Sequence, residues 1–317
     1  MKKDVKIGLL FLLITILILS GLILMIYFVY FNLPLNPEKL NVDLGKQLEV
    51  INLSQAVPQF YSNMKFNHNT ITYKIENSCE KERVERMLNA FDELSSRVSY
   101  IEFKSVSENP DIEVTCSNVK INGDDDYFIA GEGGAKEIID TGRYYVINQG
   151  LILLYGNKDA IRCDWPNVEL HELLHVFGFD HSKNKESLMY PYLESCDQKL
   201  DESIISDLKK LYSQENLPDL YFENVYALKK GKYLDFNITI KNSGVIDAKG
   251  VFLVLYDEGE KVHEFELNDV PFGAGVLFSV NNAKLNNRDP ENIQLIIDDE
   301  NKIKEIDENN NIAILKL

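Results

Sequence analysis

Basic residues are scarce in this chain and form no obvious cluster. Its 317 residues include 33 Lys and Arg against 50 Asp and Glu, which gives a formal net charge of −17. A nucleic-acid-binding protein usually carries a basic patch, so we exclude nucleic acid as a partner. The acidity is typical of a well-solvated surface. The alternative interpretation is calcium binding or repulsion of acidic partners.

The N-terminal segment lacks any charge over 25 residues, from 7 to 31. A helix of that length spans about 37 Å, which exceeds the roughly 30 Å hydrocarbon core of a bilayer. Lys2, Lys3 and Lys6 precede it, so the positive-inside rule keeps this end in the cytoplasm and places the rest of the chain outside the cell. We therefore predict a single-pass anchor in the cell membrane. The alternative, a cleaved signal peptide, is disfavoured because no small-residue cleavage site follows the run.

Cysteine is also sparse, and no two of the four residues have the CxxC spacing of a metal knuckle. An even number in an oxidising compartment indicates two disulfides, with three possible pairings. The order along the chain favours Cys79–Cys116 and Cys163–Cys196. The alternative is four reduced, half-buried thiols.

Composition and periodicity divide the remaining chain into three parts. We predict a polar stalk over residues 32–69, an α+β domain over residues 70–217 and an all-β domain over residues 218–317. In the α+β domain, apolar spacing predicts helices over residues 81–98, 168–177 and 201–212, and strands over residues 71–75, 100–106 and 112–116. It also predicts a loop over residues 123–134 and a strand or hairpin region over residues 144–147 and 151–155. The last part has no helical periodicity, and its alternating segments predict an immunoglobulin-like sandwich with strands over residues 233–241, 250–256, 261–267, 276–280, 293–298 and 312–317.

Three of the five histidines lie within eleven residues, at positions 171, 175 and 181. His171 and His175 are four residues apart on a predicted helix, so both project from the same face. Gly178 can adopt a positive φ and end the helix, which lets the chain return His181 as a third metal ligand. Three imidazoles leave a fourth position open, as in catalytic zinc sites. Glu172 is placed to act as a general base on a water molecule rather than to bind the metal.

The spacing HExxHxxGxxH, followed by Met189, resembles the metzincin clan of zinc endopeptidases. Within that clan, His181-Ser182 and the run from Leu188 to Pro191 are similar to the matrixins, the matrix-metalloproteinase group. The resemblance implies a twisted mixed sheet with helices, zinc held by the three histidines, Glu172 as the catalytic base, and Met189 and Pro191 in a turn that supports the site.

The same resemblance implies an extended peptide or protein substrate. A glycine-rich edge strand containing Gly133, Gly134 and Ala135 would pair with the substrate backbone. Tyr190 and Tyr192 would lie beside the pocket for the side chain that follows the cleaved bond.

Some positions depart from the matrixin pattern. Leu174 stands where many matrixins have Gly, and we expect it to be tolerated on the helix. Only His68 and His263 remain outside the motif, so the second, structural zinc of animal members is not expected. The acidic run from Asp124 to Asp126 is a possible Ca²⁺ site, although such loops are more often merely solvated.

The C-terminal part resembles a CARDB module, a family named for cell adhesion and with an immunoglobulin-like fold. The segments that carry this resemblance are residues 241–244, 255–259 and 298–311. A spacer role and the binding of a surface ligand both remain open.

These observations predict a membrane-anchored extracellular zinc endopeptidase. The alternative is a cell-surface adhesion protein that uses an inactive protease fold, and the intact Glu172 argues against it. A gluzincin would use a distant Glu as its third ligand, and His181 argues against that.

Overall fold

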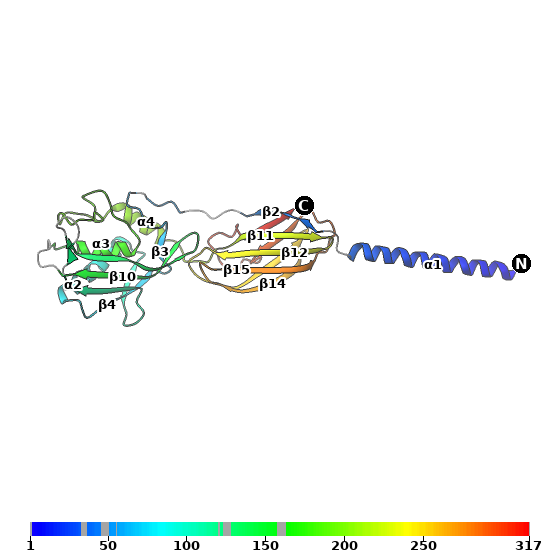
Figure 1. Ribbon diagram of the computed structural model, residues 1–317, viewed down its shortest axis with the longest axis horizontal. Coiled ribbons are helices and arrows are strands. Elements are labelled where there is room, and N and C mark those ends of the chain that lie inside the picture. The colour runs from blue at the N-terminus through cyan, green and yellow to red at the C-terminus, as the bar shows by residue number, and fades with distance from the viewer. Residues whose placement is uncertain are drawn as a thin grey trace.

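The structure is a computed structural model that describes residues 2–32, 37–45, 51–54, 56–119, 121–122, 128–156 and 163–316. An N-terminal helix, a β-sandwich and an α+β domain follow one another in space, with the sandwich in the middle (Figure 1). Helix α1 (Lys2–Asn32) contains one span, Leu12–Tyr30, that is long and apolar enough to cross a membrane, with a mean hydropathy of 2.8. None of that span is buried against the rest of the chain.

The α+β domain is built on a mixed sheet with the strand order β3-β10-β6-β4-β5, and β9 pairs with β10. Strand β9 is antiparallel to β10, whereas the pairings among the other strands are parallel. The strands are β3 (Met64–Phe66), β4 (Thr70–Ile75), β5 (Glu102–Ser105), β6 (Ile112–Ser117), β9 (Gly131–Asp140) and β10 (Tyr145–Tyr155), with a separate pair β7 (Ile121–Asn122) and β8 (Phe128–Ile129).

Three helices complete this domain: α2 (Lys81–Arg97), α3 (Asn167–Val176) and α4 (Glu202–Tyr212). Helix α2 buries one apolar stripe, in which Phe91 lies 4.3 Å from the ring of Tyr73 on β4 and 4.6 Å from the ring of Phe103 on β5. The predicted disulfide between Cys79 and Cys116 is confirmed, with Cα atoms 4.8 Å apart. It joins the start of α2 to β6 across the sheet.

The second domain is a sandwich of two antiparallel sheets, ordered β1-β11-β12-β15 and β14-β13-β16-β17-β2. Alternate residues of facing strands fill the core between the sheets. The strands are β1 (Glu38–Lys39), β2 (Asn41–Leu44), β11 (Leu220–Lys230), β12 (Tyr233–Asn242), β13 (Ala248–Asp257), β14 (Glu260–Val270), β15 (Gly275–Lys284), β16 (Ile293–Ile297) and β17 (Ile312–Lys316).

The segment predicted as a stalk, residues 32–69, differs from that prediction in its described part. Strand β1 pairs with β11 and β2 pairs with β17, so both belong to the sandwich. Val57 is buried in the core of the α+β domain, and β3 pairs with β10. Strands as short as these contain too few residues for an alternation of apolar and polar side chains to be recognised. They are stabilised by pairing with the edges of sheets whose other strands lie elsewhere in the chain.

Smaller differences concern strand length. The region predicted as a strand or hairpin over residues 144–147 and 151–155 is the single strand β10, and β9 begins inside the predicted loop over residues 123–134. Strand β11 was not predicted. The predicted helices agree with α2, α3 and α4 to within one residue at each end.

Candidate active site

The three histidines of the motif converge on one point. Helix α3 carries His171 and His175, the chain turns at Gly178, and His181 returns beside them. The Nε2 atom of His175 lies 3.0 Å from that of His171 and 3.2 Å from that of His181. Ligand nitrogens about 2.05 Å from a tetrahedral zinc are about 3.3 Å apart, so the donor set fits that metal.

Hydrogen bonds orient two of these rings. The Nδ1 atom of His171 lies 2.7 Å from the carbonyl oxygen of Leu188, and that of His175 lies 2.7 Å from the carbonyl oxygen of Phe179. A carbonyl only accepts, so Nδ1 carries the proton and each Nε2 presents its lone pair to the common centre.

The electrostatic surroundings keep these rings neutral. Burial lowers the pKa of His171 to about 3, with a smaller contribution from the neighbouring histidines. Burial also lowers the pKa of His175 and of His181. Neutral imidazole is the form that binds a metal ion.

Gly178 is required where the chain turns between the second and third histidines. Its φ is +86°, and a Cβ there would lie 2.3 Å from Sδ of Met64. The turn is held from outside the motif, because the amide of Phe60 donates to the carbonyl oxygen of Gly178 and the amide of Asp180 donates to that of Pro58. Segment 58–60 therefore helps to set the position of the third histidine.

Glu172 lies on α3 next to the first histidine and is 6% exposed. Burial raises its pKa to about 8, and the charge of Glu132 adds to the shift, while a hydrogen bond from the Gly133 amide opposes it. A carboxyl group whose pKa lies near neutral pH is suited both to accept and to donate a proton.

Strand β9 lies directly against this carboxylate-bearing turn of α3. A Cβ on Gly133 would lie 2.2 Å from the carbonyl oxygen of Glu172, so the two backbones touch. Gly134 and Ala135 follow along the strand, which pairs with β10 on one side and, among the described residues, with no strand on the other. The three residues predicted to bind substrate therefore share one free sheet edge beside Glu172.

A surface pocket of about 440 Å³ opens next to this edge. Its walls combine β9 with aromatic residues from the segment predicted as a stalk. The lining residues are Phe60, Tyr61, Met64, Gly134, Ala135 and Ile138. The ring of Phe60 lies 6.0 Å from that of His175, so the pocket adjoins the histidine cluster. The sequence signal for it was two adjacent aromatic residues within an otherwise polar segment.

The loop that follows the third histidine contacts the cluster through the carbonyl oxygen of Leu188, which lies 2.7 Å from Nδ1 of His171. Met189 is fully buried, and its carbonyl oxygen accepts a 2.8 Å hydrogen bond from the amide of Ser182. Beyond it the rings of Tyr190 and Tyr192 lie 5.8 Å apart, and Pro191 between them is exposed. That Tyr190 and Tyr192 contact the substrate stays a prediction.

Two further contacts that the sequence did not reveal fix this loop and α3. The side chain of Gln198, which is 4% exposed, donates to the carbonyl oxygen of Tyr192. On the other side of α3, Glu169 accepts two hydrogen bonds from Arg86 on α2, at 2.9 and 3.1 Å. No motif marks such contacts, because they form only once the chain has folded, and Arg86 and Glu169 are 83 residues apart.

The second predicted disulfide is also confirmed. Cys163 and Cys196 have Cα atoms 5.4 Å apart, and they join the segment before α3 to the loop that carries the tyrosines.

The remaining predicted residues lie elsewhere. His68 contacts Asp111 at 2.9 Å, and His263 contacts the carbonyl oxygen of Lys284 at 2.9 Å. The candidate calcium ligands, Asp124 to Asp126, lie outside the described residues.

Comparison with known proteins follows the two-domain division. Residues 65–213 match the matrixin family and residues 217–314 match the CARDB family. No curated protein matches the chain. Among solved structures, the crystal structure of a CARDB domain from Pyrococcus furiosus in complex with di-metal ions is 19% identical, covers 32% of this chain and 87% of its own, and has a TM-score of 0.26. A solution structure of a domain from Methanosarcina acetivorans is 18% identical, covers 32% of this chain and 90% of its own, and has a TM-score of 0.27. The chain therefore contains a matrixin domain, of a family of zinc metalloproteases, followed by a CARDB domain.

Proposed function

We propose that this protein is a membrane-anchored zinc endopeptidase whose catalytic domain faces the cell exterior. The convergence of three Nε2 atoms, with that of His175 3.0 Å from that of His171 and 3.2 Å from that of His181, carries this proposal. The matrixin match, which extends beyond the histidines over residues 65–213, also supports it.

His171, His175 and His181 would hold the metal through Nε2. A zinc ion bound there supplies Lewis-acid polarisation of a peptide carbonyl and activates a water molecule for attack. Glu172 takes the proton from the attacking water and then passes it to the leaving amine, which is the work of a general base and acid. Its burial against β9 keeps bulk water from the carboxyl group, and the Gly133 amide helps to orient it.

The substrate we propose is an extended peptide segment. The free edge of β9, which includes Gly133, Gly134 and Ala135, carries backbone hydrogen-bonding groups, so a peptide can add to the sheet as a further strand. Such binding requires an unfolded or loop segment of the target protein. Tyr190 and Tyr192 on one side and Phe60 on the other then flank the residues next to the cleaved bond.

The proposed location follows from α1. Its span from Leu12 to Tyr30 is long and apolar enough to cross a membrane, and the lysines at positions 2, 3 and 6 favour the cytoplasmic side for the N-terminus. Both disulfides lie after this span, which suits an oxidising exterior.

A peptide-library digest by the full-length chain in nanodiscs tests the proposal. We expect zinc-loaded parent protein to cut internal peptide bonds, to stop when a chelator removes the metal, and to resume when zinc is returned. Glu172→Gln should keep its zinc and lose about 10²- to 10⁴-fold in kcat. Glu186→Gln, which removes an exposed carboxyl in the same domain, should behave as the parent.

A folded, zinc-loaded parent that cuts nothing would contradict the proposal. That outcome would favour the second candidate, an adhesion protein, for which the CARDB match over residues 217–314 is the specific observation. Equal activity of the parent and Glu172→Gln would instead remove Glu172 from the proposed mechanism.

A further inference from the structure

The hairpin formed by β9 and β10 connects two regions of the molecule. Near its start, β9 packs on the active-site helix, since Gly133 contacts the backbone of Glu172. At its other end, the turn over residues 141–144 enters the CARDB domain. From Gly133 to Ile139 is six residues, which is about 20 Å of extended strand. One continuous strand therefore runs from the candidate substrate edge to the domain interface.

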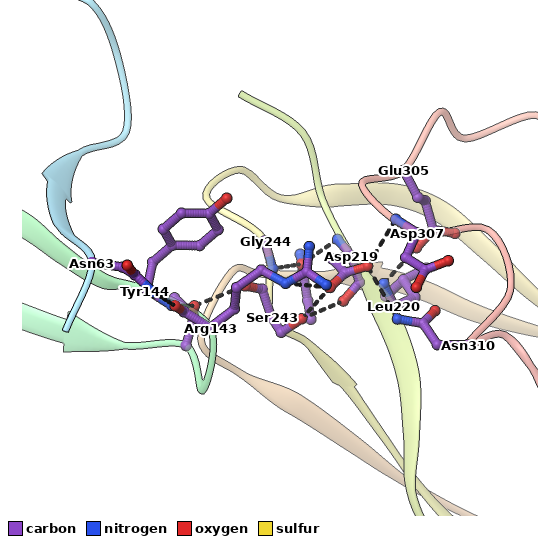
Figure 2. A network of polar contacts seen from close by, with 12 residues as sticks. Asn63, Arg143, Tyr144, Asp219, Leu220, Ser243, Gly244, Glu305, Asp307 and Asn310 are labelled. Atoms are coloured by element: carbon purple, nitrogen blue, oxygen red, sulfur yellow. Dashed lines mark hydrogen bonds and ion pairs between the residues drawn. The ribbon is translucent and has the colours of Figure 1, made fainter. Parts of the chain in front are cut away.

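Polar contacts join this turn to the CARDB domain. The Oγ1 of Thr141 donates to the carbonyl oxygen of Ser243 at 2.8 Å, and Thr141 is 4% exposed. The Nε of Arg143 lies 3.4 Å from Oδ2 of Asp219, with side chains 5% and 0% exposed. Figure 2 shows Arg143 reaching from the hairpin turn into the sandwich, where Asp219 and Ser243 meet it.

Asp219 is itself held in the CARDB domain. Its carboxylate accepts hydrogen bonds from the hydroxyl of Ser243, the amide of Asp307 and the side chain of Asn310, and the two oxygens share these donors (Figure 2). Because these partners come from two separate loops of the sandwich, they hold the carboxylate of Asp219 in one position next to Arg143.

Apolar contacts fix the same end of the hairpin. Tyr144 of the turn packs in one buried cluster with Val245 of the sandwich, and Ile139 of β9 packs against it. Gly273 of the CARDB domain approaches so closely that a Cβ there would lie 2.6 Å from Cγ2 of Ile139 and 3.2 Å from the carbonyl oxygen of Asp140. The last residues of β9 thus have no freedom to shift towards the sandwich.

We propose that the CARDB domain positions the substrate-binding edge strand of the matrixin domain, with Thr141 and Arg143 as the positioning residues. This inference rests on the proposed function, because it assigns β9 to peptide binding. Neither residue touches the histidine cluster, so their effect reaches the substrate through the alignment of β9.

The consequence is a dependence on substrate length. A peptide of eight residues pairs with several residues of β9, whereas a peptide with only one residue on each side of the cut needs little of the strand. If loss of the interface contact weakens two backbone hydrogen bonds between the strand and the peptide, we expect kcat/KM for the long peptide to fall about tenfold relative to the short one. A plain loss of folded protein lowers both activities equally and leaves their ratio unchanged.

The test compares Arg143→Met, Thr141→Val and the parent, all as full-length chains in nanodiscs. Lys316→Met is the matched control, because it removes an exposed ion pair with Asp43 that joins β17 to β2 within the CARDB domain and involves no residue of the turn. We expect both turn variants to keep their zinc and to lower the long-to-short ratio of kcat/KM about tenfold, through KM, and the control to keep the parent ratio. Arg143→Lys, which keeps the charge, should restore most of the ratio.

Hydrogen exchange provides a readout that does not need activity. Amides of β9 should exchange at least tenfold faster in Arg143→Met and Thr141→Val than in the parent, while those of β6 stay unchanged. Parental β9 exchange and a parental ratio in both turn variants would overturn the inference. If the parent cleaves no peptide, the proposed function fails, and β9 exchange alone then decides whether the CARDB domain positions the strand.

Discussion

Two adjacent glycines on β9 allow a sharp test of how closely the edge strand and the active-site helix are packed. A Cβ on Gly133 would lie 2.2 Å from the carbonyl oxygen of Glu172 and 2.7 Å from its carbonyl carbon. Ordinary contact begins at about 3.4 Å, so Gly133→Ala must separate the two backbones by more than 1 Å. A Cβ on Gly134 has no atom within 4 Å. The same substitution one residue apart is therefore predicted to have opposite effects.

For Gly133→Ala we expect the matrixin domain to lose about 1–3 kcal/mol of unfolding free energy, as in overpacked cores. Because a displacement of about 1 Å at a reacting centre can cost about 10²-fold in rate, we expect a loss of that order in kcat/KM. For Gly134→Ala we expect unchanged stability or a gain of up to about 1 kcal/mol, since alanine restricts the unfolded chain.

Urea unfolding followed by the fluorescence of Trp165, the single tryptophan, measures both variants. Zinc content by mass spectrometry is the control, because the histidines do not lie on β9 and should keep the metal in both. If Gly133→Ala unfolds within about 0.5 kcal/mol of the parent and cleaves peptide as fast, the argued contact between β9 and α3 is refuted.

Two other perturbations follow from contacts that hold the matrixin domain. Arg86→Met should destabilise this domain by about 3–5 kcal/mol, because it leaves the Glu169 carboxylate buried, at 7% side-chain exposure, and without its partner. The fluorescence of Trp165 in a urea titration measures the loss of stability. An unchanged urea midpoint would contradict the assigned role of this ion pair. A chain that starts at residue 37 should keep the midpoint of the parent, whereas one that starts at residue 63 lacks β1, β2 and the buried Val57 and should unfold at lower urea in both domains. Equal midpoints for the two truncated chains would show that these strands add no stability.

The parts of the site that were predicted from the sequence are local ones. His171 and His175 share a helix face because they are four residues apart, and Gly178 needs its positive φ in order to return His181. These constraints act within eleven residues, so spacing alone was enough to predict them. The roles assigned to Glu172 remain a prediction, although its burial is now described.

The parts that were missed depend on partners far apart in the chain. Segment 58–60 pairs with the chain around residues 178–180, and nothing in its composition shows that a turn more than 100 residues later needs it. Arg86 and Glu169 are each ordinary charged helix residues until the helices pack. The ion pair between Arg143 and Asp219 was not predicted for the same reason, because the residue types in a buried ion pair are the same as those in an exposed one.

The position of the catalytic domain in the chain has a mechanical consequence. The sandwich takes β1 and β2 from before the matrixin domain and its other strands from after it. A single proteolytic cut in the segment that joins β2 to β3 therefore does not release the enzyme, because α1 stays clamped to the sandwich through the pairing of β1 with β11 and β2 with β17. Release of the catalytic domain from α1 would also require β1 and β2 to dissociate from their sheets. A pulling force between a bound substrate and the membrane proposed to hold α1 would pass through these strands and along the sandwich. The 11-residue strand β11 of that sandwich is about 36 Å long.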